Sequence, residues 1–141
     1  MKLSTGLRNG LLSGDDLKAL LDGGEIRVYE GAVPSTADDS IGSAVLLGTY
    51  KNGGSGITFD AAVNGVISKA AGETWGGTIA ATGTPSFFRH VLSSDDGSAS
   101  STALRIQGTC GLVGADLNMA SLSWTSGGTM QPIESYAITI A

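Results

Sequence analysis

Glycine and other turn-forming residues interrupt this chain so often that its apolar segments are all short. The 22 glycines are about twice the usual proportion, and they are dispersed without the triplet period of collagen. Between them lie segments in which side chains alternate between two faces, as at Ile26 and Val28 against Arg27 and Tyr29. Such alternation is typical of half-buried strands. The sequence therefore predicts an all-β fold.

About eight such segments follow one another along the chain, each bounded by turn signals. A β-sandwich or jelly roll of about eight strands fits this pattern best, and an open barrel is the alternative. The segments on either side of Ser126–Gly128 are expected to pair as a final hairpin. Near the C-terminus the alternation places Tyr136, Ile138 and Ile140 on one face of a strand.

One short helix is predicted before the strands begin, at about residues 14–22. Ser13 is a suitable N-cap with Asp16 three residues later, and Gly23 is a suitable stop. Leu17 and Leu21 then share one apolar face, which must lie against the protein's own sheet or a neighbouring subunit. In a chain of 141 residues we therefore expect an N-terminal arm, residues 1–12, and a single β-domain, residues 13–141.

Charge divides the chain unevenly. The formal net charge is −5, yet Lys2 and Arg8 are the only charged side chains in residues 1–12. An acidic body argues against nucleic-acid binding, which needs clustered Lys and Arg. A basic arm on such a body either docks on an acidic partner or is a solvated terminus. No apolar segment is long enough to span a membrane, so no membrane partner is expected.

Residues that could carry chemistry are few and isolated. His90 is the one histidine and lies in an aromatic segment without a nucleophile motif nearby, so a structural role is expected. Cys110 is the one cysteine, which excludes an internal disulfide and, with one histidine, a zinc site of the usual ligands. The acidic pairs Asp38–Asp39 and Asp95–Asp96 lack the spacing of a calcium loop. We expect no enzyme, no metal and no cofactor.

Two tryptophans and a tyrosine offer another kind of site. Trp75, Trp124 or Tyr136 could form an exposed platform for stacking on sugars, as in a carbohydrate-binding or receptor-binding β-module. Packing in the core is the alternative for each of them.

The order of several segments resembles a known kind of protein. LSTGLRNGLL, then a helix ending in LLDGGEIRVYEG, then VPSTADDSIGSAVLLGTY resemble small structural virion proteins of tailed bacteriophages. GVISKAAGETWGGTIAATGTPSFFRHV and RIQGTCGLVGADLNMASLSW are similar in character, so the resemblance runs along most of the chain.

This resemblance implies a capsid cement or decoration protein, with a tail or neck component as the alternative. Its partners would be the major capsid protein or other virion proteins, with self-association. It would be made in the host cytoplasm and act on the virion, with the capsid surface as the expected place. The arm and helix would dock on the lattice, or the helix would instead close one end of the sandwich. The partner-binding residues under the docking hypothesis are Lys2, Arg8, Leu11, Leu12, Leu17 and Leu21.

Overall fold

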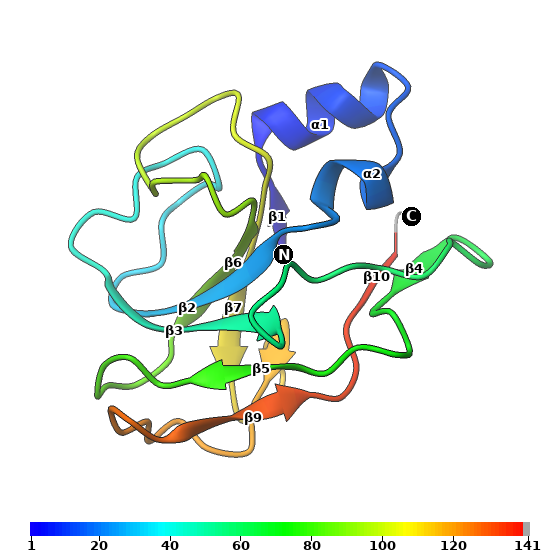
Figure 1. Ribbon diagram of the computed structural model, residues 1–141. Coiled ribbons are helices and arrows are strands. Elements are labelled where there is room, and N and C mark those ends of the chain that lie inside the picture. The colour runs from blue at the N-terminus through cyan, green and yellow to red at the C-terminus, as the bar shows by residue number, and fades with distance from the viewer. Residues whose placement is uncertain (140–141) are drawn as a thin grey trace.

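The computed structural model describes residues 1–139, which form ten strands and two short helices (Figure 1). The strands are β1 Lys2–Leu3, β2 Glu25–Glu30, β3 Val45–Asn52, β4 Val66–Ser68, β5 Trp75–Thr78, β6 Phe87–Val91, β7 Arg105–Gly111, β8 Leu117–Asn118, β9 Thr129–Ile133 and β10 Ala137–Thr139. The helices are α1 Thr5–Leu12 and α2 Leu17–Leu21. The predicted all-β, sandwich-like fold is confirmed, with two helices in place of one.

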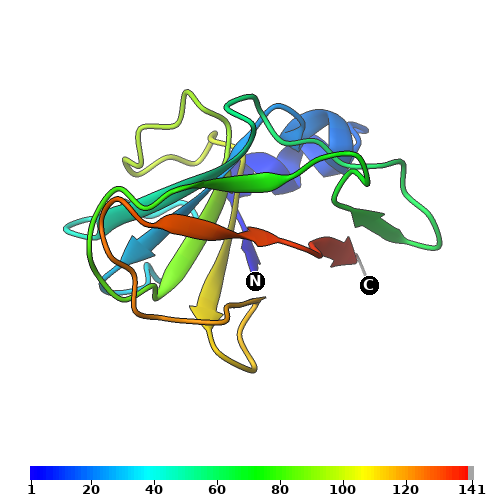
Figure 2. The same cartoon turned by 60° about the horizontal axis from the view of Figure 1, so that its bottom comes forward.

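Eight of these strands belong to one antiparallel sheet with a single parallel pair. The order is β1-β7-β6-β2-β3-β5-β9, and β8 runs parallel to β7 on the same side as β1. Strands β4 and β10 form a separate two-stranded ribbon at one side of the molecule (Figure 1). Figure 2 shows the end of the sheet formed by β5 and β9 running across β6 and β7. The sheet thus encloses its core as two layers.

The central strands β2, β6 and β7 are covered on both faces. Ile26, His90 and Ile106 are aligned across the three strands and face the core, where all three are fully buried. Arg27, Arg89 and Gln107 are aligned on the opposite face, beneath the loops 31–44 and 92–104. This double cover explains why every residue of β6 is buried although its sequence contains arginine and histidine.

Two helices replace the one predicted at residues 14–22. The chain is already helical from Thr5, and Ser13 is the C-cap of α1 rather than the N-cap of the next helix. Gly14 follows with φ +104°, a left-handed conformation that ends α1 at little steric cost. The N-cap of α2 is Asp16, whose carboxylate accepts a hydrogen bond from Ala19 N at 2.7 Å.

Helix α1 contains two glycines, which lower helix propensity. For this reason the sequence pattern did not predict a helix at residues 5–12. Gly6 is required by packing, because a Cβ there would lie 2.3 Å from the carbonyl oxygen of Thr102. The glycine lets α1 approach the backbone just before β7. Long-range contact therefore outweighs the local preference of the sequence.

The predicted final hairpin is wrong. Strand β9 pairs with β5, and β10 pairs with β4, so neither pairs with the segment before Ser126–Gly128. Trp124 instead forms an isolated bridge with Gly83. The predicted alternation holds for the described residues, since Tyr136 and Ile138 are buried, whereas Ile140 lies outside residues 1–139.

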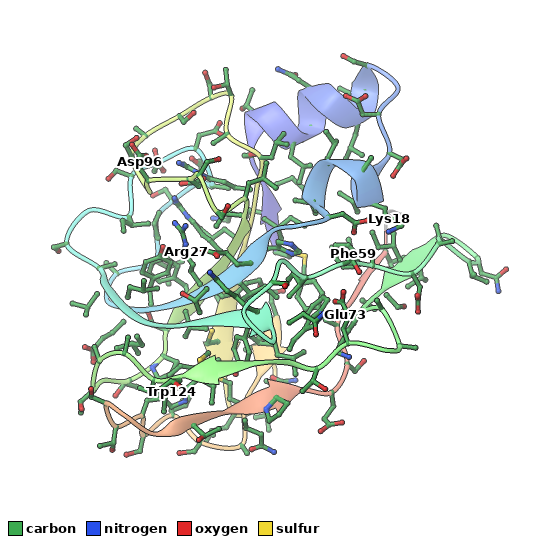
Figure 3. All side chains as sticks on the ribbon, viewed as in Figure 1. Lys18, Arg27, Phe59, Glu73, Asp96 and Trp124 are labelled. Atoms are coloured by element: carbon green, nitrogen blue, oxygen red, sulfur yellow. The ribbon has the colours of Figure 1, made fainter. Side chains whose placement is uncertain are left out.

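Aromatic side chains fill the core near the two-stranded ribbon. Phe59 lies against His90, Trp75 and Tyr136, with ring centroids 5.5 to 6.1 Å apart. Glu73 fastens this region, because it accepts hydrogen bonds from the Trp75 indole at 2.6 Å and from Thr58 N at 2.9 Å (Figure 3). The core is therefore a continuous apolar cluster with a few fixed polar contacts at its edge.

Candidate interaction surface

Residues 1–12 are not a separate arm, because they are built into the body. Lys2 and Leu3 form β1 and pair with Gln107 and Ile106 of β7. Ser4, which is buried, ties the turn into α1: its Oγ accepts hydrogen bonds from Leu7 N at 3.1 Å and Arg105 N at 3.0 Å. The same hydroxyl donates to the carbonyl of Ala103 at 2.7 Å. The predicted docking arm is therefore a structural part of the domain, as strand β1 and helix α1.

The leucines predicted to bind a partner have different environments. Leu17 and Leu21 are buried in the protein's own core, and Leu11 is half-buried against it. The alternative, in which the helix closes on its own body, thus holds for these residues. Leu12 differs, because 86% of its surface is exposed at the C-terminal end of α1.

The two basic residues of the predicted docking set are exposed, and both make local contacts. Lys2 Nζ donates to the carbonyl of Ser35 at 2.5 Å, and Arg8 Nη2 donates to Thr5 Oγ1 at 2.9 Å. The Asp38 carboxylate lies near Arg8 and accepts hydrogen bonds from Thr5 Oγ1 at 2.6 Å and Thr5 N at 2.8 Å. These bonds lower the pKa of Asp38. Nearby negative charge therefore weakens the basic character of this surface.

A second exposed apolar feature lies in the loop between β7 and β8. Leu112 and Val113 are 55% and 86% exposed, between Gly111 and Gly114. We call these two residues the β7–β8 tip. The sequence contained a signal for this tip. Two adjacent large apolar residues directly between glycines are expected at an exposed turn rather than inside a buried strand. Leu112 and Val113 were not among the residues predicted to bind a partner.

The β7–β8 tip has a rigid base. Asp116 accepts a hydrogen bond from Thr109 N at 3.0 Å and forms an ion pair with the N-terminal ammonium of Met1 at 3.0 Å. Ala115 N donates to Asn118 Oδ1 at 3.1 Å. These bonds fix the backbone on both sides of the tip. Figure 1 places this loop, after the arrowhead of β7, at the opposite end of the molecule from α1, the helix that ends at Leu12.

A cleft of about 370 Å³ opens between β9 and residues 117–124. Tyr50 and Trp124 line it, and their polar atoms are already bonded: Tyr50 OH to the carbonyl of Gln131 at 3.1 Å, and Trp124 Nε1 to the carbonyl of Ser121 at 3.2 Å. Burial raises the pKa of Tyr50 to about 12. The lining is mixed, with polar residues such as Asn118, Gln131 and Glu134 beside the apolar ones, and none of the lining residues is a basic partner for Glu134.

The aromatic residues considered for sugar binding are not exposed. Trp75 is fully buried, and Trp124 and Tyr136 are nearly so. Trp124 reaches only the wall of the cleft beside β9 (Figure 3). These three residues therefore form no exposed aromatic platform.

The isolated residues considered for chemistry have structural surroundings. His90 is buried between Phe59 and Tyr136, and burial lowers its pKa to about 4. Burial raises the pKa of Cys110 to about 12, which disfavours the reactive thiolate. Asp95 forms an ion pair with Arg105, while Asp96 and Asp39 accept hydrogen bonds within their own loops.

Within residues 1–139, no group of three or more His, Cys, Asp and Glu side chains is placed to hold a metal ion. Neither α1 nor α2 has the length and apolar character needed to cross a bilayer. No family model, no curated protein and no solved structure matches the chain.

Proposed function

We propose that this chain is a structural virion protein of the cement or decoration type, which binds the major capsid protein lattice of a tailed bacteriophage. The order of its sequence segments supports the virion class. The observation that carries the binding role is a pair of exposed apolar projections, Leu12 and the β7–β8 tip, on rigid supports at opposite ends of the molecule.

Rigid apolar projections favour binding for a physical reason. Removing apolar surface from water is worth about 25 cal/mol per Å², and a backbone already fixed in place loses little further entropy on binding. Two such projections at opposite ends let one copy contact two neighbouring subunits. Many copies on one shell then add avidity to individually weak contacts. A protein that cements a lattice needs this arrangement rather than a reaction centre.

Deletion of residues 1–12 is not a usable test of docking, because it removes β1, the Ser4 cap and the buried Leu7. Point substitutions separate docking from folding. Leu12→Ser and Val113→Ser each change one exposed apolar side chain. Val63→Ser is the matched control, because Val63 is 66% exposed on another part of the surface.

The test adds purified protein to tailed phage particles stripped of their accessory proteins, with electron microscopy as the readout. We expect regular density on the capsid surface, with occupancy reduced by Leu12→Ser or Val113→Ser but not by Val63→Ser. Density confined to the tail or neck would contradict the cement function and support the alternative, a tail or neck component. Shells and tails that both remain bare would contradict the virion proposal, and an equal loss with Val63→Ser would contradict the named projections.

A further inference from the structure

Three arginines lie on the outer face of the sheet, away from the apolar core. Arg89 and Arg105 are buried there, and Arg27 is half-buried. Arg27 and Arg89 are directly opposite each other on β2 and β6, and Arg105 lies on β7. The loops 31–44 and 92–104 cover them through hydrogen bonds to loop carbonyl groups. Figure 3 shows Arg27 beneath the loop that carries Asp96. Like charges opposite one another destabilise a sheet unless other groups compensate them.

Two of the three guanidinium groups have a carboxylate partner. Arg27 Nε donates to Glu25 Oε1 at 2.7 Å. Arg105 makes a two-pronged contact with Asp95, through Nε at 2.5 Å and Nη2 at 3.0 Å. Each of these two charges is therefore neutralised by a carboxylate in direct contact.

Arg89 has only neutral partners. Its Nε donates to Gln107 Oε1 at 3.0 Å, and its Nη2 donates to the carbonyl groups of Asp39 at 2.7 Å and Thr36 at 3.4 Å. The side chain of Arg89 is only 1% exposed, and its buried Nη1 has no acceptor among residues 1–139. Burial, and then the positive charge of Arg105, lower the pKa of Arg89. The carboxylates of Asp95 and Asp39 raise this pKa, but not enough to offset the lowering, and neither carboxylate contacts the guanidinium. Arg89 is therefore a buried positive charge without a carboxylate in direct contact.

A buried charged donor without an acceptor is costly, and native structures nearly always satisfy such a group with protein, water or an ion. Water would satisfy the Nη1 hydrogens but would leave Arg89 without a negative charge in direct contact, since Asp95 and Asp39 act on it only from a greater distance. An anion satisfies both requirements. The covering loops restrict access, which favours a small, monatomic anion.

We propose that Arg89 Nη1 is the centre of a binding site for a small inorganic anion of the halide type, enclosed between the β2–β6–β7 face and the loops 31–44 and 92–104. The bound anion neutralises Arg89 and holds the covering loops on the sheet. The site rests on these contacts alone and is independent of the proposed virion function.

The first test compares thermal unfolding of the wild-type protein in sodium chloride and in sodium gluconate at equal ionic strength, since gluconate is too large to enter. We expect chloride to raise Tm saturably, by about 4 °C when it exceeds its dissociation constant tenfold. Arg89→Met should abolish this difference, whereas Arg8→Gln, which changes an exposed arginine, should retain it. If Arg89→Met does not fold, the Tm comparison of the wild-type protein in chloride and gluconate and the bromide crystal structure still test the proposed site.

The second test is a crystal of the wild-type protein containing sodium bromide. An anomalous peak within hydrogen-bonding distance of Arg89 Nη1, together with the saturable Tm shift, would support the site. Ordinary water density at that position would overturn the proposal, as would equal Tm values in chloride and gluconate. A bromide peak without any effect on Tm would mean binding at crystal concentration only, and would also overturn it.

Discussion

At the scale of single residues, α1 carries two leucines of opposite character. Leu7 is fully buried under the cap made by Ser4, whereas Leu12 is 86% exposed five residues later. A leucine thus contributes to stability at position 7, whereas a leucine at position 12 is available for binding. Substituting each leucine in turn separates the two roles.

We expect Leu7→Ala to lower the free energy of unfolding by about 2–5 kcal/mol, because it removes buried methyl groups and leaves a cavity. Leu12→Ala should change it by less than about 0.5 kcal/mol, as is usual for exposed sites. Urea denaturation of both variants measures the difference. Equal effects of the two substitutions would show that α1 does not pack as described.

His90 is the second residue whose environment decides its behaviour. Its pKa in the folded protein is about 4, whereas the unfolded chain has an ordinary value near 6.5. The unfolded state therefore binds the proton more readily, so the contribution of neutral His90 to stability is complete above about pH 6.5 and is lost as the pH falls toward 4. The expected loss is about 3 kcal/mol.

Measurement of the free energy of unfolding between pH 7 and pH 4 checks this expectation in the wild type and in His90→Leu, a variant of similar volume. The variant should lose much less stability over this interval. The remaining slope would come from carboxylates with lowered pKa, such as Asp38 and Asp116. Parallel pH curves for the two proteins would contradict the assigned role of His90.

At the scale of elements, close backbone approach joins α1 to the segment before β7. Gly6 makes this approach possible, since a Cβ would overlap the carbonyl groups of Thr102 and Ala103. A glycine inside a helix normally lowers its stability by about 0.5–1 kcal/mol relative to alanine. At Gly6 the tertiary contact reverses that preference.

Gly6→Ala should therefore destabilise the protein by about 1–3 kcal/mol, although alanine is the better helix former. Gly72→Ala is the control, because a Cβ at this position would have no heavy atom of another part of the chain within 4 Å, and its φ is not positive. Thermal unfolding of the two variants gives the comparison. A rise in Tm for Gly6→Ala would show that α1 stands farther from Thr102 than described.

At the scale of the whole molecule, the long loops 31–44 and 92–104 are held on the outer face of the sheet by buried arginines. Arg105 joins both loops, since it contacts Asp95, the carbonyl of Ser98 and the carbonyl of Ala37. This network replaces a second layer of regular structure. It accounts for the stability of a face that would otherwise be covered only by irregular chain.

Asp95→Asn should destabilise the protein by about 3–5 kcal/mol, because it leaves the buried guanidinium of Arg105 without its carboxylate. Asp96→Asn is the adjacent control. Among residues 1–139 the exposed side chain of Asp96 bonds Ser98 and no buried charge, so a much smaller effect is expected. Denaturant unfolding measures both. Similar effects of the two substitutions would mean that the Arg105–Asp95 pair does not fasten the loops.

The sequence by itself determined the local features of this protein. Period-two alternation, as at Tyr136 and Ile138, and frequent turn residues were sufficient for the all-β class, because these patterns depend on neighbouring residues only. The same local reasoning placed a helix near Leu17 and Leu21 and correctly put those leucines on one face. It could not find α1, where glycines concealed a helix that tertiary packing stabilises.

The tertiary structure alone decided which strands pair and which exposed groups remain for binding. The pairing of β9 with β5, and the burial of Arg89 beneath loops distant in sequence, depend on contacts that no local pattern records. The same holds for the candidate surface: Leu12 and Leu21 look alike in the sequence, yet one is exposed and the other fills the core. Burial is a property of the folded chain, because it is set by what the rest of the molecule places over each side chain.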